Sequence, residues 1–303
     1  MQRVESWWDA TRRFVLRGAT AAGRTVAPPR IGLALGGGFA RGIAHIGVLR
    51  AFERNNIPIY AIAGVSAGSM VAAAYAGGCT TQHIEAIARS MRFRDVAGWT
   101  INRLGLAHSE RMIPFLKRLL TEDRFEKMKI PLAIVASDLG TGTPMIFRGH
   151  GDVVMPIRAS CSYPGLFLPI RHGKRCLVDG AITMEVPAKP LREMGATRVI
   201  SIHLPNASAC PDPSSMFAVI NHCFQSMSER LEGEWRKHSD LVITPAVGEL
   251  AWDSFDSADR MIELGEQAAE AAMPVIKGWL KPFEIGERGN RFLPAAARNG
   301  ALG

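Results

Sequence analysis

The stretch Gly64-Val65-Ser66-Ala67-Gly68 is a G-x-S-x-G pentapeptide that follows an apolar run and begins an alanine-rich one. The preceding Tyr60-Ala61-Ile62-Ala63 predicts a short buried strand, and residues 67–76 predict a helix packed closely on a sheet. A sharp turn from strand to helix exposes a serine hydroxyl at its tip, and small flanking residues let neighbouring chain approach. The pentapeptide therefore predicts a nucleophile elbow, with Ser66 as nucleophile and Gly64 and Gly68 as its small neighbours. Because ordinary glycine turns also carry this pattern, a second element is needed to decide.

A second glycine-rich stretch lies 28 residues upstream of the serine. Residues 31–35 predict a first strand, which leads into Gly36-Gly37-Gly38-Phe39-Ala40-Arg41-Gly42 and then a helix over residues 43–55. Glycines at the start of a helix let several backbone amides converge on one oxygen anion. The stretch therefore predicts an oxyanion hole.

Two nucleotide-binding interpretations of these glycines are excluded. A dinucleotide fingerprint needs a third glycine at the position that Arg41 occupies, and an acidic residue at the end of the second strand, which here ends in the serine turn. A phosphate-binding P-loop ends in Gly-Lys-Ser/Thr, whereas this loop ends in Gly42-Ile43.

A serine nucleophile needs a base that takes its proton. Asp179-Gly180-Ala181 follows the strand-like residues 175–178, so its carboxylate can reach a neighbouring loop. An Asp-Gly pair is more often a plain turn, and Asp138, near the end of the predicted strand 132–136, is a second acidic candidate that we interpret as a turn residue.

Together, these three motifs resemble the patatin-like phospholipases, and most of all the short bacterial members related to the neuropathy-target-esterase catalytic domain. The resemblance covers about residues 30–245, and the segments Ala44-His45-Ile46-Gly47-Val48-Leu49 and Tyr163-Pro164-Gly165-Leu166-Phe167 also fit it. It implies a Ser–Asp dyad of Ser66 and Asp179, and acyl hydrolysis of phospholipids or lysophospholipids without a metal or other cofactor. It also implies an oxyanion hole in the loop that holds Gly36, Gly37, Gly38 and Arg41, with the Gly37 and Gly38 amides as donors.

Alternation of predicted strands and helices favours a three-layer α/β/α sandwich with a mostly parallel central sheet. We expect a catalytic domain over residues 30–245, preceded by a helix and linker over residues 1–29. A C-terminal helix and a flexible basic tail follow over residues 246–303. Residues 92–107 show no clear hydrophobic periodicity and predict a loop or lid. We expect residues 163–168 to form a wall of the substrate pocket.

The net charge of +8 is concentrated at the two ends of the chain. Residues 1–30 hold six arginines and two acidic residues, and residues 281–303 hold four basic and two acidic residues, so only +2 remains for the body. This distribution argues against a nucleic-acid-binding face. Five scattered cysteines without C-x-x-C spacing predict a reducing, cytoplasmic location, and no histidine pattern indicates a metal site.

Residues 3–17 predict a basic amphipathic helix, with Trp7, Trp8 and Phe14 on its apolar side. Two partners remain open for this helix: a protein surface, which includes self-association, or the inner face of a membrane.

Two other functions remain open at this point. One is an α/β-hydrolase-type esterase or thioesterase with a Ser–His–Asp triad, since Ser66, Asp179 and His203 follow its chain order. The other is a binding or scaffolding protein in which the serine turn has no catalytic role.

Overall fold

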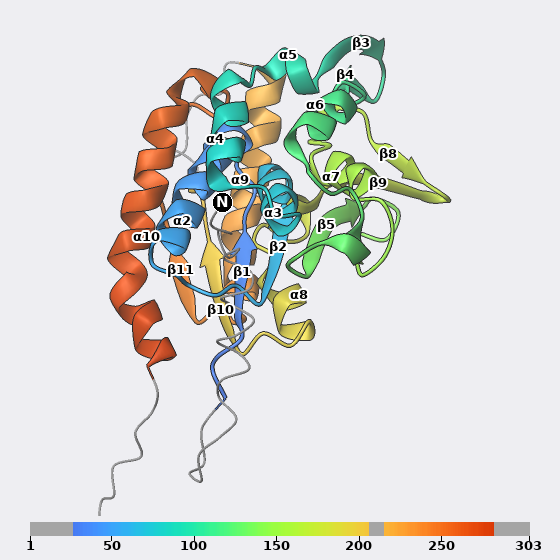
Figure 1. Ribbon diagram of the computed structural model, residues 1–303. Helices are drawn as coiled ribbons and strands as arrows, with labels where there is room; N and C mark the ends of the chain where they lie inside the picture. Colours follow the sequence, from blue (N-terminus) through green and yellow to red (C-terminus); the bar gives the residue numbers. More distant parts are fainter. Residues whose placement is uncertain (1–26, 206–214, 282–303) are drawn as a thin grey trace, which may run out of the picture.

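The computed structural model describes residues 27–205 and 215–281 (Figure 1). It is a mixed α/β structure in which helices cover a central, mostly parallel sheet, as the sequence predicts. The predicted helix over residues 3–17 lies outside the described residues. Within them, no helix combines the length and the apolar character needed to span a membrane.

The central sheet has eight strands in the order β11-β10-β1-β2-β5-β9-β8, with β6 also paired to β5. The first five of these strands are parallel, whereas β6, β8 and β9 join as antiparallel strands at one side. The strands are β1 (Ile31–Leu35), β2 (Ala61–Val65), β5 (Leu132–Asp138), β6 (Thr143–Arg148), β8 (Ile170–His172), β9 (Arg175–Asp179), β10 (Arg198–Ile202) and β11 (Leu241–Ile243).

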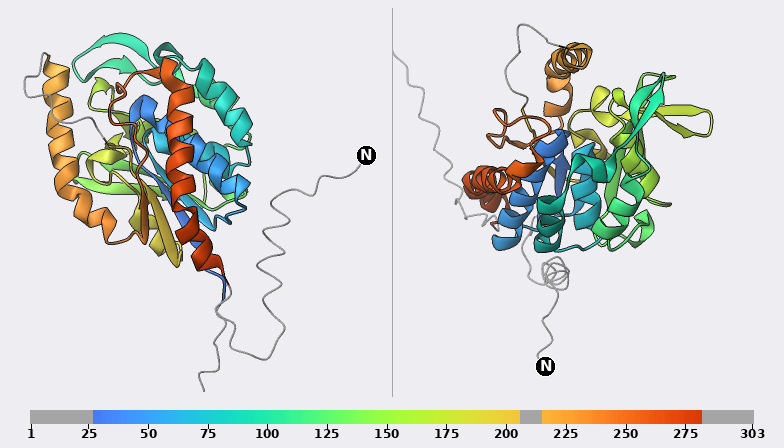
Figure 2. Two further views of the ribbon diagram at one scale, coloured as in Figure 1. Left: turned by 90° about the vertical axis from the view of Figure 1, so that its left-hand side faces the viewer. Right: turned by 90° about the horizontal axis from the view of Figure 1, so that it is seen from above.

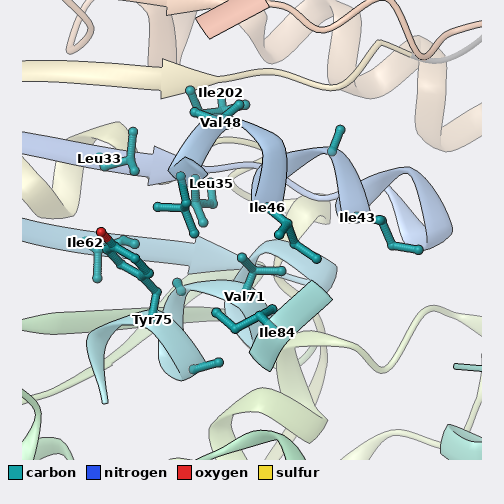
Figure 3. Close-up of a cluster of buried hydrophobic side chains, with 14 of the residues drawn as sticks. Leu33, Leu35, Ile43, Ile46, Val48, Ile62, Val71, Tyr75, Ile84 and Ile202 are labelled. Carbon is teal, nitrogen blue, oxygen red and sulfur yellow. The ribbon is translucent and has the colours of Figure 1, made fainter. Parts of the chain in front are cut away.

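Side chains of different size cover the two faces of this sheet. Because successive side chains alternate along a strand, Leu33, Leu35 and Ile62 share one face, while Ala34 and Ala63 lie on the other. The larger side chains pack against aliphatic side chains of the helices, which Figure 3 shows in close-up. This face carries the larger of the buried clusters, so most of the core lies on this side.

Helices lie on both sides of the sheet (Figure 2). The face with large side chains packs against α2 (Ala44–Arg54), α3 (Ala67–Ala76), α4 (Thr81–Ser90), α6 (Met112–Leu119) and α10 (Ala258–Leu280). The alanine-rich face packs against α8 (Ala188–Glu193) and α9 (Met216–Arg236) through Leu191 and Trp235. The remaining helical elements are α5 (Phe93–Val96), α7 (Val154–Ser160) and the 3-10 turns η1 (Phe39–Ile43), η2 (Phe125–Lys127), η3 (Gly180–Ile182) and η4 (Phe255–Ser257).

Helices α2 and α10 lie unusually close together, although they come from opposite ends of the described chain. A Cβ atom at Gly47 would lie 1.9 Å from the Ile262 oxygen, and one at Gly265 would lie 1.9 Å from the Ala44 oxygen. Only glycine therefore permits this approach of the two backbones. Ion pairs of Arg50 with Glu266 and of Arg54 with Glu270 flank the contact.

Residues 92–107 are more ordered than the predicted loop. They form α5 and a hairpin of β3 (Gly98–Asn102) and β4 (Gly105–His108), and β7 (Gly165–Phe167) adds a third strand beside β4. This small sheet stands at the end of the molecule toward which the parallel strands point (Figure 1).

Candidate active site

Ser66 links the end of β2 to the start of α3. Its backbone has φ 50° and ψ −129°, a conformation that side-chain-bearing residues rarely adopt and that the surrounding packing must hold in place. Its two glycine neighbours make the turn sterically possible: a Cβ at Gly64 would lie 2.5 Å from the Gly68 oxygen, and one at Gly68 would lie 2.4 Å from the Leu35 oxygen. The N-terminus of helix α3, which starts at Ala67, lies directly beside Ser66, so the positive end of the helix dipole is next to the nucleophile.

Two buried serine hydroxyls fix the backbone of this turn. The Ser66 amide donates to Ser160 Oγ at 2.8 Å, and that hydroxyl in turn donates to the Val135 carbonyl at 2.6 Å. Ser69 Oγ donates to the Ser66 carbonyl at 2.6 Å. No local sequence pattern marks Ser160, because its partners lie far away in the chain.

Asp179 lies at the end of β9, directly beside the serine. Ser66 Oγ donates to Asp179 Oδ2 at 2.7 Å, and the Ala181 amide donates to Oδ1 at 2.9 Å. Burial raises the pKa of the Asp179 carboxyl to about 7, although both hydrogen bonds act in the opposite direction. A carboxyl that titrates near neutral pH and touches the serine hydroxyl can accept its proton.

The other candidate bases lie elsewhere. His203 Nε2 lies 3.4 Å from Glu185, and its ring packs against Trp235. Among the described residues, no histidine is hydrogen-bonded to Ser66 or Asp179. Asp138 Oδ1 accepts from the Gly140 amide, as expected of a turn residue.

The glycine loop runs past Ser66, but its three amides differ in availability. The Gly36 amide donates to the Ile202 carbonyl at 3.1 Å, and the Gly37 amide makes a longer bond of 3.3 Å to the Glu185 carbonyl. The Gly38 amide has no acceptor among the described residues. Gly36 is thus tied into the strand pairing, and Gly38 is the amide most available to a substrate oxygen.

A buried histidine holds this loop from behind. His45 Nε2 lies 2.9 Å from the Gly36 carbonyl, which only accepts, so the nitrogen carries the proton. Burial lowers the pKa of His45 to about 4, which keeps the ring neutral. In the sequence, His45 belongs to the segment 44–49 that fits the family resemblance, and no local pattern indicates its contact with Gly36.

Arg41 is buried one turn further along, in η1. Its Nη1 donates to the Pro205 carbonyl at 2.9 Å, and burial lowers the pKa of its guanidinium. This bond ties the glycine loop to the segment that follows β10.

Ser66 opens onto two cavities of different character. The apolar cavity runs between α3, α4 and α6, and the empty space in it and at its solvent-filled mouth is about 770 Å³. The second cavity, which we call the polar cavity because its lining is more polar than that of the first, reaches Asp179, Gly37, Gly38 and Arg41 and is lined on one side by α9. The empty space in it and at its mouth is about 730 Å³. Ser66 and Phe39 line both cavities, so the serine lies where they meet.

The predicted wall at residues 163–168 divides between these cavities. Phe167 lines the apolar cavity, and Tyr163 lines the polar one. Cys161 also lines the apolar cavity, where burial and the Asp179 charge raise the pKa of its thiol and so disfavour the thiolate. In the part of the chain that the structure describes, no three His, Cys, Asp or Glu residues are grouped to hold a metal ion.

Solved structures that are similar to this chain include those of VipD from Legionella pneumophila and ExoU from Pseudomonas aeruginosa. VipD gives a TM-score of 0.48 at 15% identity, covering 86% of this chain and 68% of VipD. A structure of ExoU with SpcU gives a TM-score of 0.41 at 15% identity, covering 84% of this chain and 53% of that chain.

Relatives found by sequence have a higher identity to this chain than these two structures have. An uncharacterized NTE family protein of Mycobacterium tuberculosis is 32% identical over 186 residues, which are 60% of this chain and 51% of the relative. Lysophospholipase NTE1 of Cryptococcus neoformans is 33% identical over 193 residues, which are 59% of this chain and 11% of that protein. This chain thus spans about half the length of the mycobacterial relative and a small part of the fungal one.

The sequence model that describes patatin-like phospholipases matches residues 33–192, more than half of the chain. This region contains the glycine loop, the serine turn and Asp179, and the match confirms the resemblance that those motifs carry. The chain belongs to the patatin-like phospholipase family.

Proposed function

We propose that this protein is a serine acyl hydrolase that cleaves carboxylic ester bonds of phospholipids or lysophospholipids. The observation that carries the proposal is the direct 2.7 Å hydrogen bond from Ser66 Oγ to Asp179 Oδ2 at the meeting point of an apolar and a polar cavity. The apolar cavity suits an acyl chain, and the polar cavity suits the alcohol part of the ester.

In the first half of the proposed reaction, Ser66 Oγ attacks the ester carbonyl carbon while Asp179 Oδ2 takes the hydroxyl proton. The carbonyl oxygen becomes an oxyanion, and the Gly38 amide donates to it; the Gly37 amide joins if its long bond to Glu185 opens. When the tetrahedral intermediate collapses, the carbon–oxygen bond to the leaving alcohol breaks. Asp179 returns the proton to that oxygen, and an acyl-serine remains.

In the second half, water attacks the acyl carbonyl while Asp179 takes its proton. The Ser66–acyl bond breaks, the proton passes to Ser66 Oγ, and the free fatty acid leaves. Asp179 alone accepts and returns the proton in both half-reactions. Ser66 is the nucleophile in the first half and the leaving group in the second.

The proposal is tested with a fluorophosphonate probe, which phosphonylates an activated serine and releases fluoride. We expect the full chain to be labelled on the peptide that contains Ser66, and the Ser66→Ala variant not to be labelled there. Release of fatty acid from lysophosphatidylcholine should fall at least about 10³-fold in Ser66→Ala and in Asp179→Asn. Labelling at another residue, or unchanged hydrolysis by Ser66→Ala, would contradict the proposal.

The triad alternative makes a different prediction for His203. Because this ring contacts Glu185 and Trp235, His203→Ala should keep hydrolysis within about tenfold of the unmodified chain. Activity as low as that of Ser66→Ala would instead favour a Ser–His–Asp mechanism.

A further inference from the structure

The β3–β4 hairpin exposes large apolar side chains to solvent. The exposed fractions are 70% for Trp99, 106% for Ile101, 63% for Leu104 and 48% for Leu106. Single exposed apolar residues are common on protein surfaces, but four within eight positions of one projecting hairpin form a patch that indicates an interaction site. We call these four residues the hairpin patch.

An aromatic path leads from the hairpin patch to the apolar cavity. The rings of Trp99 and Phe93 have centroids 5.8 Å apart, and those of Phe93 and Phe167 are 6.1 Å apart. Phe93 and Phe167 both line the cavity that ends at Ser66. A row of apolar side chains therefore leads from the outside of the hairpin to the cavity that contains the nucleophile.

Basic side chains accompany the patch. Arg94, Arg103 and Arg111 are exposed, and Arg111 Nη1 donates to the Arg94 carbonyl at 3.2 Å, which joins the start of α6 to α5. Of the acidic residues nearby, Asp95 is occupied as an acceptor for the Arg92 amide, and Glu110 lies 3.9 Å from His108. The segment 92–111 holds four arginines and two acidic residues, so its net charge is positive.

We propose that the hairpin patch inserts into an anionic lipid surface, so that acyl chains pass along Phe93 and Phe167 to Ser66. Apolar side chains at a hairpin tip with arginines beside them match a membrane interface, where lipid tails take the apolar groups and anionic head groups take the charges. A protein partner would cover the patch equally well, but it would not explain why the patch continues into the cavity. The inference deepens the proposed function and rests on it for the fate of the acyl chain.

The experiment measures binding of the full chain, in a Ser66→Ala background, to vesicles of phosphatidylcholine with about 30% phosphatidylglycerol. This background leaves the vesicle lipids intact, so binding is measured separately from hydrolysis. The test variant is Ile101→Ser/Leu104→Ser, which changes two exposed side chains outside the candidate active site. The matched control is Val275→Ser, because Val275 is 49% exposed on the last turns of α10, at the opposite end of the molecule from the hairpin (Figure 1).

We expect the hairpin variant to lose at least about tenfold in vesicle partitioning, and the Val275→Ser control to bind like its parent. With Ser66 restored, the hairpin variant should hydrolyse p-nitrophenyl butyrate within about twofold of the unmodified chain, because this soluble ester does not need a lipid surface. Equal vesicle binding by the parent and the hairpin variant, or no binding by the parent, would overturn the inference. A change in the solution mass of the hairpin variant would overturn it in favour of a second copy as partner. If instead binding behaves as expected and no ester is cleaved, the proposed function fails and the docking surface stands.

Discussion

The backbone amide of Ser66 and the hydroxyl of Ser160 are joined by a 2.8 Å hydrogen bond across 94 positions of sequence. Because Ser160 also donates to the Val135 carbonyl, it connects the serine turn to the middle of the sheet. A turn with φ 50° at its central residue needs such external support.

Removing this hydroxyl should therefore impair the chemical step more than substrate binding. We expect Ser160→Ala to lower kcat on a soluble ester by about tenfold with little change in KM, since the nucleophile loses its fixed orientation. Ser162→Ala is the matched control: its hydroxyl is also buried, but it donates to the Arg158 carbonyl, whereas the Ser160 hydroxyl accepts from the Ser66 amide. Equal loss of kcat in both variants would show that Ser160 contributes only general stability.

The pKa of Asp179 determines the expected pH dependence of activity. As a base, this carboxyl acts only when it is ionised, and burial raises its pKa to about 7. The value of kcat/KM for p-nitrophenyl butyrate should thus rise with pH and level off above about pH 8. A profile that is already flat from pH 5 upward would mean that an ordinary acidic carboxyl, or another group, takes the proton.

The same burial predicts that the candidate base lowers stability. The pKa of Asp179 is higher in the folded chain than in an unfolded one, so the folded state loses stability as the pH rises from about 4 through about 7. Asp179→Asn removes the buried charge, and at pH 8 it should increase the free energy of unfolding by on the order of 2–4 kcal/mol. At pH 4 the two proteins should differ little in urea unfolding.

Asp138→Asn is the control for this effect, with the opposite sign. Asp138 accepts from the Gly140 amide and lies 3.5 Å from Arg175, so loss of its charge should destabilise the fold. If Asp179→Asn also lowers the free energy of unfolding at pH 8, interactions with neighbouring groups stabilise the ionised Asp179 more than burial destabilises it.

The glycine loop allows a test of the proposed oxyanion donor. A Cβ at Gly38 would lie 2.8 Å from Leu204 Cδ1, so Gly38→Ala should shift the loop and lower kcat by about 10²-fold or more. The double variant Gly38→Ala/Leu204→Ala should recover at least about tenfold of this loss. The shorter side chain at position 204 leaves room for the new Cβ, so the amide of residue 38 can return to its position in the unmodified chain. Near-normal turnover of folded Gly38→Ala would remove this amide from the mechanism.

Substitution of Gly37 is expected to lower hydrolysis without changing stability. A Cβ at this position would meet Ser66 Cβ at 3.4 Å, an ordinary contact distance, so Gly37→Ala should fold with an unchanged thermal midpoint. Its methyl group would nevertheless stand beside the nucleophile, and hydrolysis should fall by about 10²-fold through crowding of the substrate. Activity measured alongside the midpoint separates the two effects.

The apolar cavity predicts a dependence on acyl chain length. Ala88 is buried on α4 and lines this cavity, so Ala88→Phe should shorten the space available to an acyl chain. If two methylenes are displaced, hydrolysis of a palmitoyl ester should fall by about tenfold relative to a butyryl ester. Ala86→Phe, on the exposed side of the same helix, should leave this ratio unchanged. An equal effect of both variants would argue against this cavity as the acyl site.

Local sequence patterns predicted the fold, the family and the strand-to-helix turn at Ser66. Ser66 is marked by glycines within two positions, and the parallel strands are marked by apolar runs, so each signal lies within one short segment. Asp179 could be proposed because a strand end followed by glycine is also a local feature. The roles of Ser66 and Asp179 in catalysis stay predictions until they are tested.

Features that depend on distant parts of the chain were not predictable in this way. Ser160 looks like any helical serine until packing places it under Ser66. The sequence predicts a loop or lid over residues 92–107 instead of the hairpin, because the hairpin's turn, Arg103-Leu104, lacks the Asn-Gly or Asp-Gly signal of a tight turn. Likewise, the unequal availability of the glycine amides depends on carbonyls of Glu185 and Ile202, far along the chain.

The close crossing of α2 and α10 has a consequence for how the chain reaches this structure. During synthesis, α2 emerges early, yet the glycine surface at Gly47 is covered only when Gly265 arrives more than two hundred residues later. Contacts of such long sequence separation form late and slow folding. The face of α2 around Gly47 therefore stays without its partner helix until residues 258–280 have been synthesised, so we expect this packing to be among the last steps of folding.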